Sequence, residues 1–548
     1  MEFDAPVDLV PNRSPGRQPP PEVVQLVRTT VEAVPARPSE TPVGLLLGNI
    51  TRSGRDPVRV LAGFAAAWLL FFAILLLLPT PAGLPVEGQA VLAIVVWASI
   101  MWVTEALPAG ITGLSIPTLL IATHALPWRI EAGKASPPMA LAFSGFTDGV
   151  VWLCLFAFML GGMMRLLQLD RRIALTILDW MKASTVGRVI AGMFAVNVAL
   201  AFLVPAANAR AAAMLPVVTG IANMLGDSPR ERDCQKAIVI QSLVYGSMIC
   251  GMFILTAHLP NLILVNLYAS HGLHINYLQW MLLQFPYLGM FVITQGWVRW
   301  FFRTGGVAIA GGQARIHEQR RALGPMVPSE RALIGVFGCM AALFFLSEGS
   351  PIFELHHLPL GVIGLIGIMV LFTPGLLPFS WKQVEANTIW GTFLLLGGAL
   401  TLTTAMTSSG LAGWLAGILH ALVAGLGWWL ALLAVILGSQ IIRLGMLSNV
   451  AAVAMLAPIT YQLGQAMHLN AVAFTTLVCD SDSFSYILPT QITAAVIAYG
   501  SEKFTTLDYA KVGLGSTLIG IAYVVLVMVP WYGFLGLPVW DAAAPWPF

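Results

Sequence analysis

The run from Val60 to Leu78 contains no charged side chain and constrains the fold more than any other feature. At about 1.5 Å rise per residue, such a helix is long enough to cross a bilayer core of about 30 Å. Only 10% of the 548 residues are charged, against roughly 25% in soluble proteins. Ten more apolar segments follow the first, near 88–106, 109–126, 149–167, 238–268, 280–300, 331–347, 359–375, 387–406, 470–499 and 512–536. The sequence predicts an all-α polytopic membrane protein with about 11 transmembrane helices.

Two further apolar segments, 187–225 and 426–465, are too long for one crossing and hold polar residues and a proline in the middle. A re-entrant helical hairpin accounts for both features, because the chain would enter the bilayer, turn at mid-depth and return to the same side. Non-helical backbone at that depth is tolerated only against protein or a water-filled cavity. We therefore expect two re-entrant hairpins beside the spans.

The distribution of Lys and Arg agrees with this topology. With eleven crossings and two hairpins, the clustered basic residues fall on one face, and the loop at 127–138 is the exception. The positive-inside rule then predicts a cytoplasmic N-terminus and an external C-terminus in the cytoplasmic (inner) membrane. Residues 1–57 are rich in proline and lack an apolar signal segment, so we expect a disordered cytoplasmic tail.

A polar cytoplasmic linker at 303–330 separates two similar halves, 58–302 and 331–548. Each half has a hairpin with an alanine-rich stretch and a proline, "NARAAAMLPVV" and "SNVAAVAMLAPI". Each hairpin precedes a long span interrupted by polar residues and proline, "LTAHLPNLI" and "LPTQITAAV". An odd number of crossings gives the halves opposite orientation. Inverted repeats with broken helices indicate a secondary transporter.

The turn of the second hairpin carries Ser448 and Asn449 inside an apolar run. Helix-terminal N–H groups at such a turn suit a carboxylate, and the two side chains add donors for an anion and oxygens for a small cation. The same pair could simply cap the second arm of the hairpin. The counterpart in the first half favours the binding role.

The motifs resemble those of the divalent anion:sodium symporter family of dicarboxylate transporters, within the ion transporter superfamily. "WVTEALPAGITGLSIPTLL", "SNVAAVAMLAPI", "MFILTAHLPNLIL" and "ILPTQITAAVIAYG" carry the resemblance, which covers about residues 58–536. It implies an elevator-type carrier in the lipid bilayer, usually a homodimer, that moves small di- or tricarboxylate anions. It also implies two Na⁺ ions at the hairpin tips and facing unwound loops, with substrate carboxylates between the tips. The substrate-binding positions that it implies are Asn208, Thr256, Asn261, Ser448, Asn449, Thr490 and Thr493.

Na⁺ candidates carried over from the family are Ser448, Asn449 and Asn208. The first tip reads Ala206-Ala207-Asn208 where the family has Ser-Asn-Thr, and Val450 replaces a threonine in the second. A hard cation needs about five or six oxygen ligands, so these losses weaken the first sodium site. Coupling could involve one sodium, protons or exchange of one anion for another. We expect weaker sodium dependence than in members with intact tips.

Ionisable residues inside the membrane are usually functional. Asp480 and Asp482 either lie at such a depth or form a solvated external helix end. Arg210 could bind a substrate carboxylate, although a structural pair with Asp480 or Asp482 is the preferred interpretation. For Arg443 we expect a structural or snorkelling role. His258 is interpreted as a neutral, hydrogen-bonded histidine, with substrate contact or proton handling as the alternative.

Other classes find little support in the sequence. No HExxH, GxSxG or GxxxxGK[ST] motif is present, so an enzyme is not expected. A net charge of +2 does not indicate a nucleic-acid partner. Hairpin repeats favour a carrier over a channel. The alternatives within the superfamily are sulfate or arsenite transport and cation–proton antiport.

Overall fold

The computed structural model describes residues 56–126, 129–131, 134–136, 138–204, 206–346, 360–446 and 448–548. The expectation of a disordered tail at 1–57 therefore falls almost entirely outside the described residues. The same holds for part of the loop at 127–138. Residues 59–548 form one compact unit, which contains the segments discussed below.

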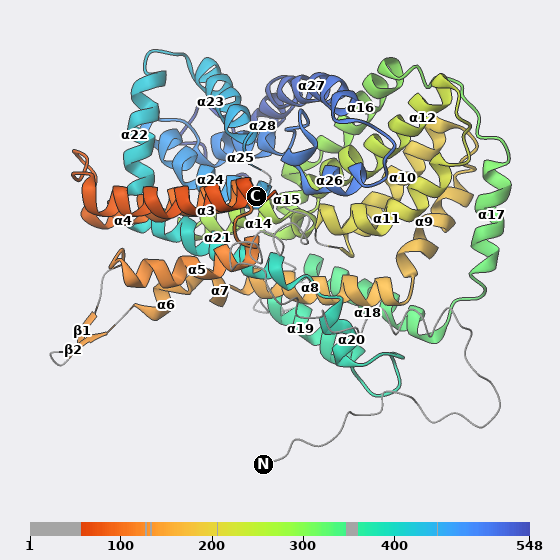
Figure 1. The fold of residues 1–548 in the computed structure, drawn as a ribbon, viewed down its shortest axis with the longest axis horizontal. Coiled ribbons are helices and arrows are strands. Elements are labelled where there is room, and N and C mark those ends of the chain that lie inside the picture. The colour runs from red at the N-terminus through yellow and green to blue at the C-terminus, as the bar shows by residue number, and fades with distance from the viewer. Residues whose placement is uncertain are drawn as a thin grey trace, which may run out of the picture. The chain divides into compact units, whose positions relative to one another are not determined.

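Helices make up nearly all of the regular structure, as predicted (Figure 1). Two three-residue strands, β1 (Arg129–Glu131) and β2 (Lys134–Ser136), pair as a small antiparallel hairpin. The helices before the linker are α3 (Pro57–Phe72), α4 (Val86–Thr104), α5 (Ala109–Ala122), α6 (Met139–Ala142), α7 (Ser144–Thr147), α8 (Gly149–Leu166), α9 (Leu169–Trp180), α10 (Val186–Ala201), α11 (Ala207–Ala222), α12 (Pro229–Val239), α13 (Gly246–Phe253), α14 (Leu259–Ser270), α15 (Tyr277–Gln284) and α16 (Tyr287–Phe301).

The linker predicted at 303–330 contains a helix, α17 (Gly312–Ala322), which packs on α9. The Asp179 carboxylate on α9 binds the Arg320 guanidinium of α17 at 2.9 Å. The helices after it are α18 (Pro328–Leu346), α19 (Leu360–Leu371), α20 (Trp381–Ala386), α21 (Trp390–Ser408), α22 (Leu411–Val423), α23 (Trp428–Arg443), α24 (Asn449–Ala466), α25 (Ala471–Asp482), α26 (Thr493–Tyr499), α27 (Thr506–Tyr523) and α28 (Val529–Phe534).

Six helices of the described residues are long and apolar enough to cross a membrane: Pro57–Leu77, Val86–Thr104, Gly149–Leu166, Pro229–Phe253, Trp390–Ser408 and Thr506–Phe534. A further pair, α22 and α23, is apolar but bent by 118°. The polytopic membrane class is thus confirmed. Eleven crossings stay a prediction, because several predicted spans are divided into shorter helices. The span at 470–499, for example, consists of α25, a 3₁₀ turn at Pro489–Gln491 and α26.

Helices α5 and α21 lie side by side (Figure 1). They approach at very short range because glycines face each other across the contact. A Cβ added to Gly398 would lie 2.2 Å from the Gly113 carbonyl oxygen. A Cβ on Gly110 would lie 2.6 Å from the Gly391 carbonyl oxygen. Small residues of this kind allow close approach of helix backbones in membranes. The glycines of "PAGITGLS" are therefore explained by packing.

Each predicted hairpin consists of two helices with a short break. α10 and α11 have 16 residues each, and α23 and α24 have 16 and 18. Sixteen residues extend about 24 Å, less than the roughly 30 Å of a bilayer core. α11 packs on α26, and α24 packs on α14, so each second arm lies beside the helix that follows the other half's unwound loop. These lengths and contacts agree with re-entrant hairpins, and the inverted repeat itself stays a prediction.

Candidate substrate and ion site

At the second tip the structure shows the capping role of Ser448, whereas the binding role that the sequence favoured stays a prediction. The Ser448 hydroxyl accepts a hydrogen bond from the Ala451 N–H at 3.2 Å, so Ser448 does cap α24. Asn449, the first residue of α24, makes its contacts across the site instead. Its amide nitrogen lies 3.5 Å from Nε2 of His258, which belongs to the unwound loop of the first half. The tip of one half thus meets the loop of the other.

Arg443 ties this tip together from the end of α23. Its guanidinium is fully buried and donates to the carbonyl oxygens of Met446 (2.8 Å) and Gln491 (2.5 Å) and to Oδ1 of Asn449. Its Nε also lies 3.2 Å from Oδ2 of Asp482, an ion pair without hydrogen-bond alignment. Arg443 is therefore structural as expected, but it does not snorkel towards a polar surface.

Arg210 forms a comparable set of contacts at the first tip. Its guanidinium is also fully buried and donates to the carbonyl oxygens of Val204 (2.7 Å), Ala257 (2.9 Å) and Ser247 (2.7 Å). Within the described part of the chain, no ion pair neutralises it. The preferred pairing of Arg210 with Asp480 or Asp482 is wrong. Arg443 holds Asp482 instead, because both lie on the side of the second hairpin, whereas Arg210 faces α13.

The two arginines have the same function at different places in the sequence. Arg443 precedes its tip and bonds the tip carbonyl of Met446 and the unwound-loop carbonyl of Gln491. Arg210 follows its tip and bonds the tip carbonyl of Val204 and the unwound-loop carbonyl of Ala257. In each half, backbone oxygens of tip and loop converge on one guanidinium.

The first unwound loop is held by Asn261 rather than open to a ligand. The Asn261 amide nitrogen lies 3.1–3.4 Å from four carbonyl oxygens, those of Gly251, Met252, Ile254 and Leu255. Its Oδ1 lies 3.3 Å from Nδ1 of His258. Asn261 is 1% exposed, so it supports the loop and orients the histidine. A direct substrate contact by Asn261 stays a prediction.

The remaining predicted site residues differ in their surroundings. Thr256 is buried, with its hydroxyl 3.2 Å from the Tyr277 hydroxyl of α15. Asn208 is half-buried, and its Oδ1 accepts from the Ala209 N–H at 3.0 Å. Thr490 and Thr493 are exposed beside the second unwound loop. Described hydrogen bonds do not join these four residues to Asn449.

Both carboxylates at the end of α25 are buried, which excludes the solvated helix end. Asp480 is 3% exposed and Asp482 is 0% exposed. The Gln284 amide of α15 donates to Asp480 at 2.9 Å. The two side chains therefore face different partners, with Asp480 directed to α15 and Asp482 to Arg443.

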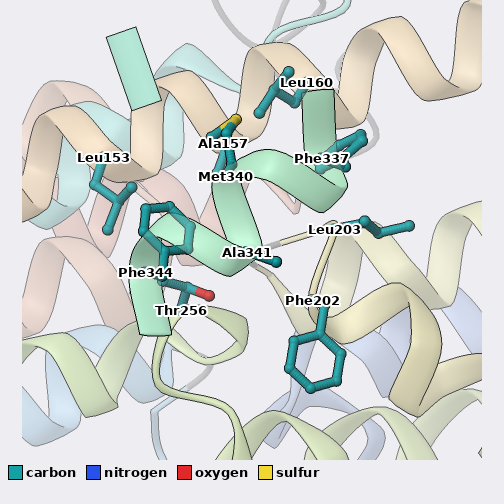
Figure 2. A pocket seen from close by; sticks show the side chains of 10 residues that line it. All are labelled: Leu153, Ala157, Leu160, Phe202, Leu203, Thr256, Phe337, Met340, Ala341 and Phe344. Carbon is teal, nitrogen blue, oxygen red and sulfur yellow. The ribbon is translucent and has the colours of Figure 1, made fainter. Parts of the chain in front are cut away.

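An apolar cavity lies beside the turn that leads from α10 to the first tip (Figure 2). Its walls come from α8, from the turn after α10 and from α18, with Thr256 as the polar member of the set: Leu153, Ala157, Leu160, Phe202, Leu203, Thr256, Phe337, Met340, Ala341 and Phe344. Its volume is about 20 Å³, room for roughly one water molecule. This cavity is too small and too apolar for a carboxylate substrate.

Sequence reasoning missed the main acceptors of the site, which are backbone carbonyl oxygens. Met446, Gln491, Val204 and Ala257 carry no side-chain signal for this role. The side chains that could have revealed it are the two arginines, since an intramembrane guanidinium needs several acceptors. Among the described residues, His, Cys, Asp and Glu do not form a group of three that could hold a metal ion.

Comparison with known proteins adds the family. The chain is 29% identical over 485 residues to a membrane protein of Cupriavidus necator, covering 86% of this chain and 93% of that one. It is 28% identical to a sodium-dependent dicarboxylate transporter of Staphylococcus saprophyticus, over 84% of this chain and 89% of that one. It is 25% identical to an L-tartrate/succinate antiporter of Escherichia coli, over 86% of this chain and 97% of that one.

Two solved structures share the fold. The YdaH transporter of Alcanivorax borkumensis superposes with a TM-score of 0.51 at 14% identity, over 78% of this chain and 99% of that one. The MtrF efflux pump of Neisseria gonorrhoeae gives 0.51 at 13% identity, over 88% and 100%. The family and the relatives are transporters, so the chain is a transporter and not an enzyme. Because the family model described as "Sodium:sulfate symporter transmembrane region" matches residues 63–538, the chain belongs to that family.

Proposed function

We propose that this transporter exchanges small dicarboxylate anions across the inner membrane without sodium. In this proposal the two tips and the facing loops enclose the anion, and the hairpins move with it in an elevator-type cycle. The chain would work as a homodimer, with the N-terminus cytoplasmic and the C-terminus external. Dicarboxylates are proposed because the relatives named above include a sodium-dependent dicarboxylate transporter and an L-tartrate/succinate antiporter.

One observation carries the sodium-independent part. At both tips, the carbonyl oxygens that could coordinate a small cation already accept hydrogen bonds from a buried guanidinium, Arg210 or Arg443. A guanidinium supplies the positive charge that a coupling cation would bring, but it is covalently attached and cannot be released. Asn449, a predicted sodium ligand, is likewise bonded to Arg443.

The charge balance favours exchange over net uptake. Asp482 neutralises Arg443, whereas Arg210 has no carboxylate partner among the described residues. In this proposal an anion between the tips supplies the counter-charge for Arg210, while Asp480 is held by the Gln284 amide. We therefore expect an empty carrier to return more slowly than a loaded one, because the guanidinium of Arg210 then has no anion beside it.

The experiment is uptake of labelled succinate into proteoliposomes that are empty or preloaded with unlabelled succinate, in sodium, potassium or choline salts. We expect uptake only into preloaded vesicles and the same rate in all three salts. Arg210→Gln should lose exchange, whereas Arg171→Gln, an exposed residue on α9, should retain it. Sodium-driven accumulation in empty vesicles would refute the proposal and favour a symporter.

A further inference from the structure

The exposed face of α16 changes character along its length. Val292 and Ile293 are 69% and 47% exposed, and Trp300, two turns further, is 70% exposed. Gly296 lies between them, and a Cβ placed there would meet no atom within 4 Å. The spacing from Ile293 to Gly296 to Trp300 is three and four residues, so the three share one helix face. An apolar stretch and an open notch therefore lead to an exposed indole.

Beyond the notch is a surface hollow of about 460 Å³, lined by Gly296, Arg299, Trp300, Arg303 and Gly305. The Arg230 guanidinium approaches from the start of α12 and donates to the Gly305 carbonyl oxygen at 3.4 Å. Within the described part of the chain, none of the three arginines forms an ion pair. The hollow thus gathers guanidinium groups that have no carboxylate to neutralise them.

Trp300 is held in place within this surface. Its ring stacks on Trp297 at 5.1 Å between centroids, and the Trp297 indole donates to the Val512 carbonyl oxygen of α27 at 3.0 Å. α16 and α27 pack side by side (Figure 1). Tryptophan at the end of a membrane helix lies at the level of lipid headgroups, and basic residues there attract anionic lipids.

We propose that this hollow binds the headgroup phosphate of an anionic phospholipid, with one acyl chain along Val292, Ile293 and the notch at Gly296. Arg299 and Arg303 would contact the phosphate, and Trp300 would cover the glycerol region. The apolar face and the notch lead to an indole flanked by two cations, as the acyl chain of a phospholipid leads to its glycerol and phosphate, whereas a soluble anion would need only the cations. The proposal is independent of the transported substrate.

The test is quenching of tryptophan fluorescence by dibrominated phosphatidylglycerol added to the purified full-length protein in detergent. The component that disappears in Trp300→Phe reports on the hollow. We expect Arg299→Gln/Arg303→Gln to lower the affinity for phosphatidylglycerol, as reported by this component, about 25-fold, at about fivefold per arginine. The control is Arg315→Gln/Arg321→Gln, which removes two exposed arginines of α17 and should leave the affinity unchanged.

Two further arms separate the lipid from other ligands. Dibrominated phosphatidylcholine should quench this component much more weakly; equal quenching would mean general lipid contact and would overturn the proposal. Inorganic phosphate at millimolar concentration should not displace phosphatidylglycerol, and full displacement would indicate a site for free anions. If Trp300→Phe removes no lipid-sensitive component, the hollow does not bind lipid.

Discussion

If transport is independent of sodium as proposed, replacing Arg443 by alanine should create a sodium response. The guanidinium contacts the carbonyl oxygens of Met446 and Gln491, Oδ1 of Asn449 and Oδ2 of Asp482. Arg443 and Asp482 are both 0% exposed, and breaking a buried pair from one side costs about 3–5 kcal/mol. The same oxygens then surround a space with a negative charge, which suits a hard cation.

The size of the response follows from mass action. For a site with a Kd of about 10 mM, 100 mM Na⁺ stabilises the folded state by about 1.4 kcal/mol. Sodium should therefore restore roughly a quarter to a half of the free energy of unfolding lost in Arg443→Ala. The wild-type protein should gain nothing, since its guanidinium cannot leave.

The assay is unfolding in detergent at 100 mM NaCl against 100 mM choline chloride, so that ionic strength is constant. The matched control is the double variant Arg443→Ala/Asp482→Asn, which lacks the negative ligand and should lose the sodium response. If the wild-type protein is stabilised by NaCl as strongly as Arg443→Ala, the guanidinium does not replace a cation and the reasoning fails.

Three other perturbations test separate contacts. Asn449→Ala should abolish exchange while the protein elutes as a folded oligomer, and wild-type transport by this variant would exclude the tip from the site. Asn261→Ala and Asn261→Asp should both lower the free energy of unfolding by about 1–3 kcal/mol, because neither side chain can donate to the loop carbonyls. A melting temperature of Asn261→Asp equal to that of the wild-type protein would contradict this role. Gly513→Ala should destabilise the protein by about 1–3 kcal/mol or more, since the new Cβ would lie 1.7 Å from the Tyr486 carbonyl oxygen. The control is Gly438→Ala, where a Cβ meets open space, and equal stability of the two variants would refute the clash.

The sequence was sufficient for the membrane class and for the helix breaks inside the two segments predicted as hairpins, because these depend on patterns of polarity along the chain. α10 ends at Ala201 and α11 begins at Ala207, within the predicted segment 187–225. Ser448 was recognised because a hydroxyl in an apolar run needs a partner, and capping supplies it. Runs of apolar residues and helix caps involve residues close together in the sequence, so a single sequence is enough to predict them.

The partners of the buried charges could not be predicted in this way. Arg210 and Asp482 both required compensation, and the sequence suggested pairing them. The fold instead brings Asp482 to Arg443 and gives Arg210 three carbonyl oxygens. Carbonyl oxygens occur at every residue, so composition does not indicate which of them turn inward. Only the three-dimensional path of the backbone decides that.

The apolar lining of the cavity between the turn after α10 and α18 bears on how the two parts could move. Phe202 and Leu203 border the cavity on one side and Phe337, Met340 and Ala341 border it on another, so its lining there offers only apolar side chains. In the proposed elevator cycle, movement along this surface would exchange one dispersion contact for another of similar strength, without a hydrogen bond to break. A hydrated ion, by contrast, would have to lose its water molecules to pass along this apolar surface. The same apolar surface would thus permit movement of the hairpin and exclude hydrated ions.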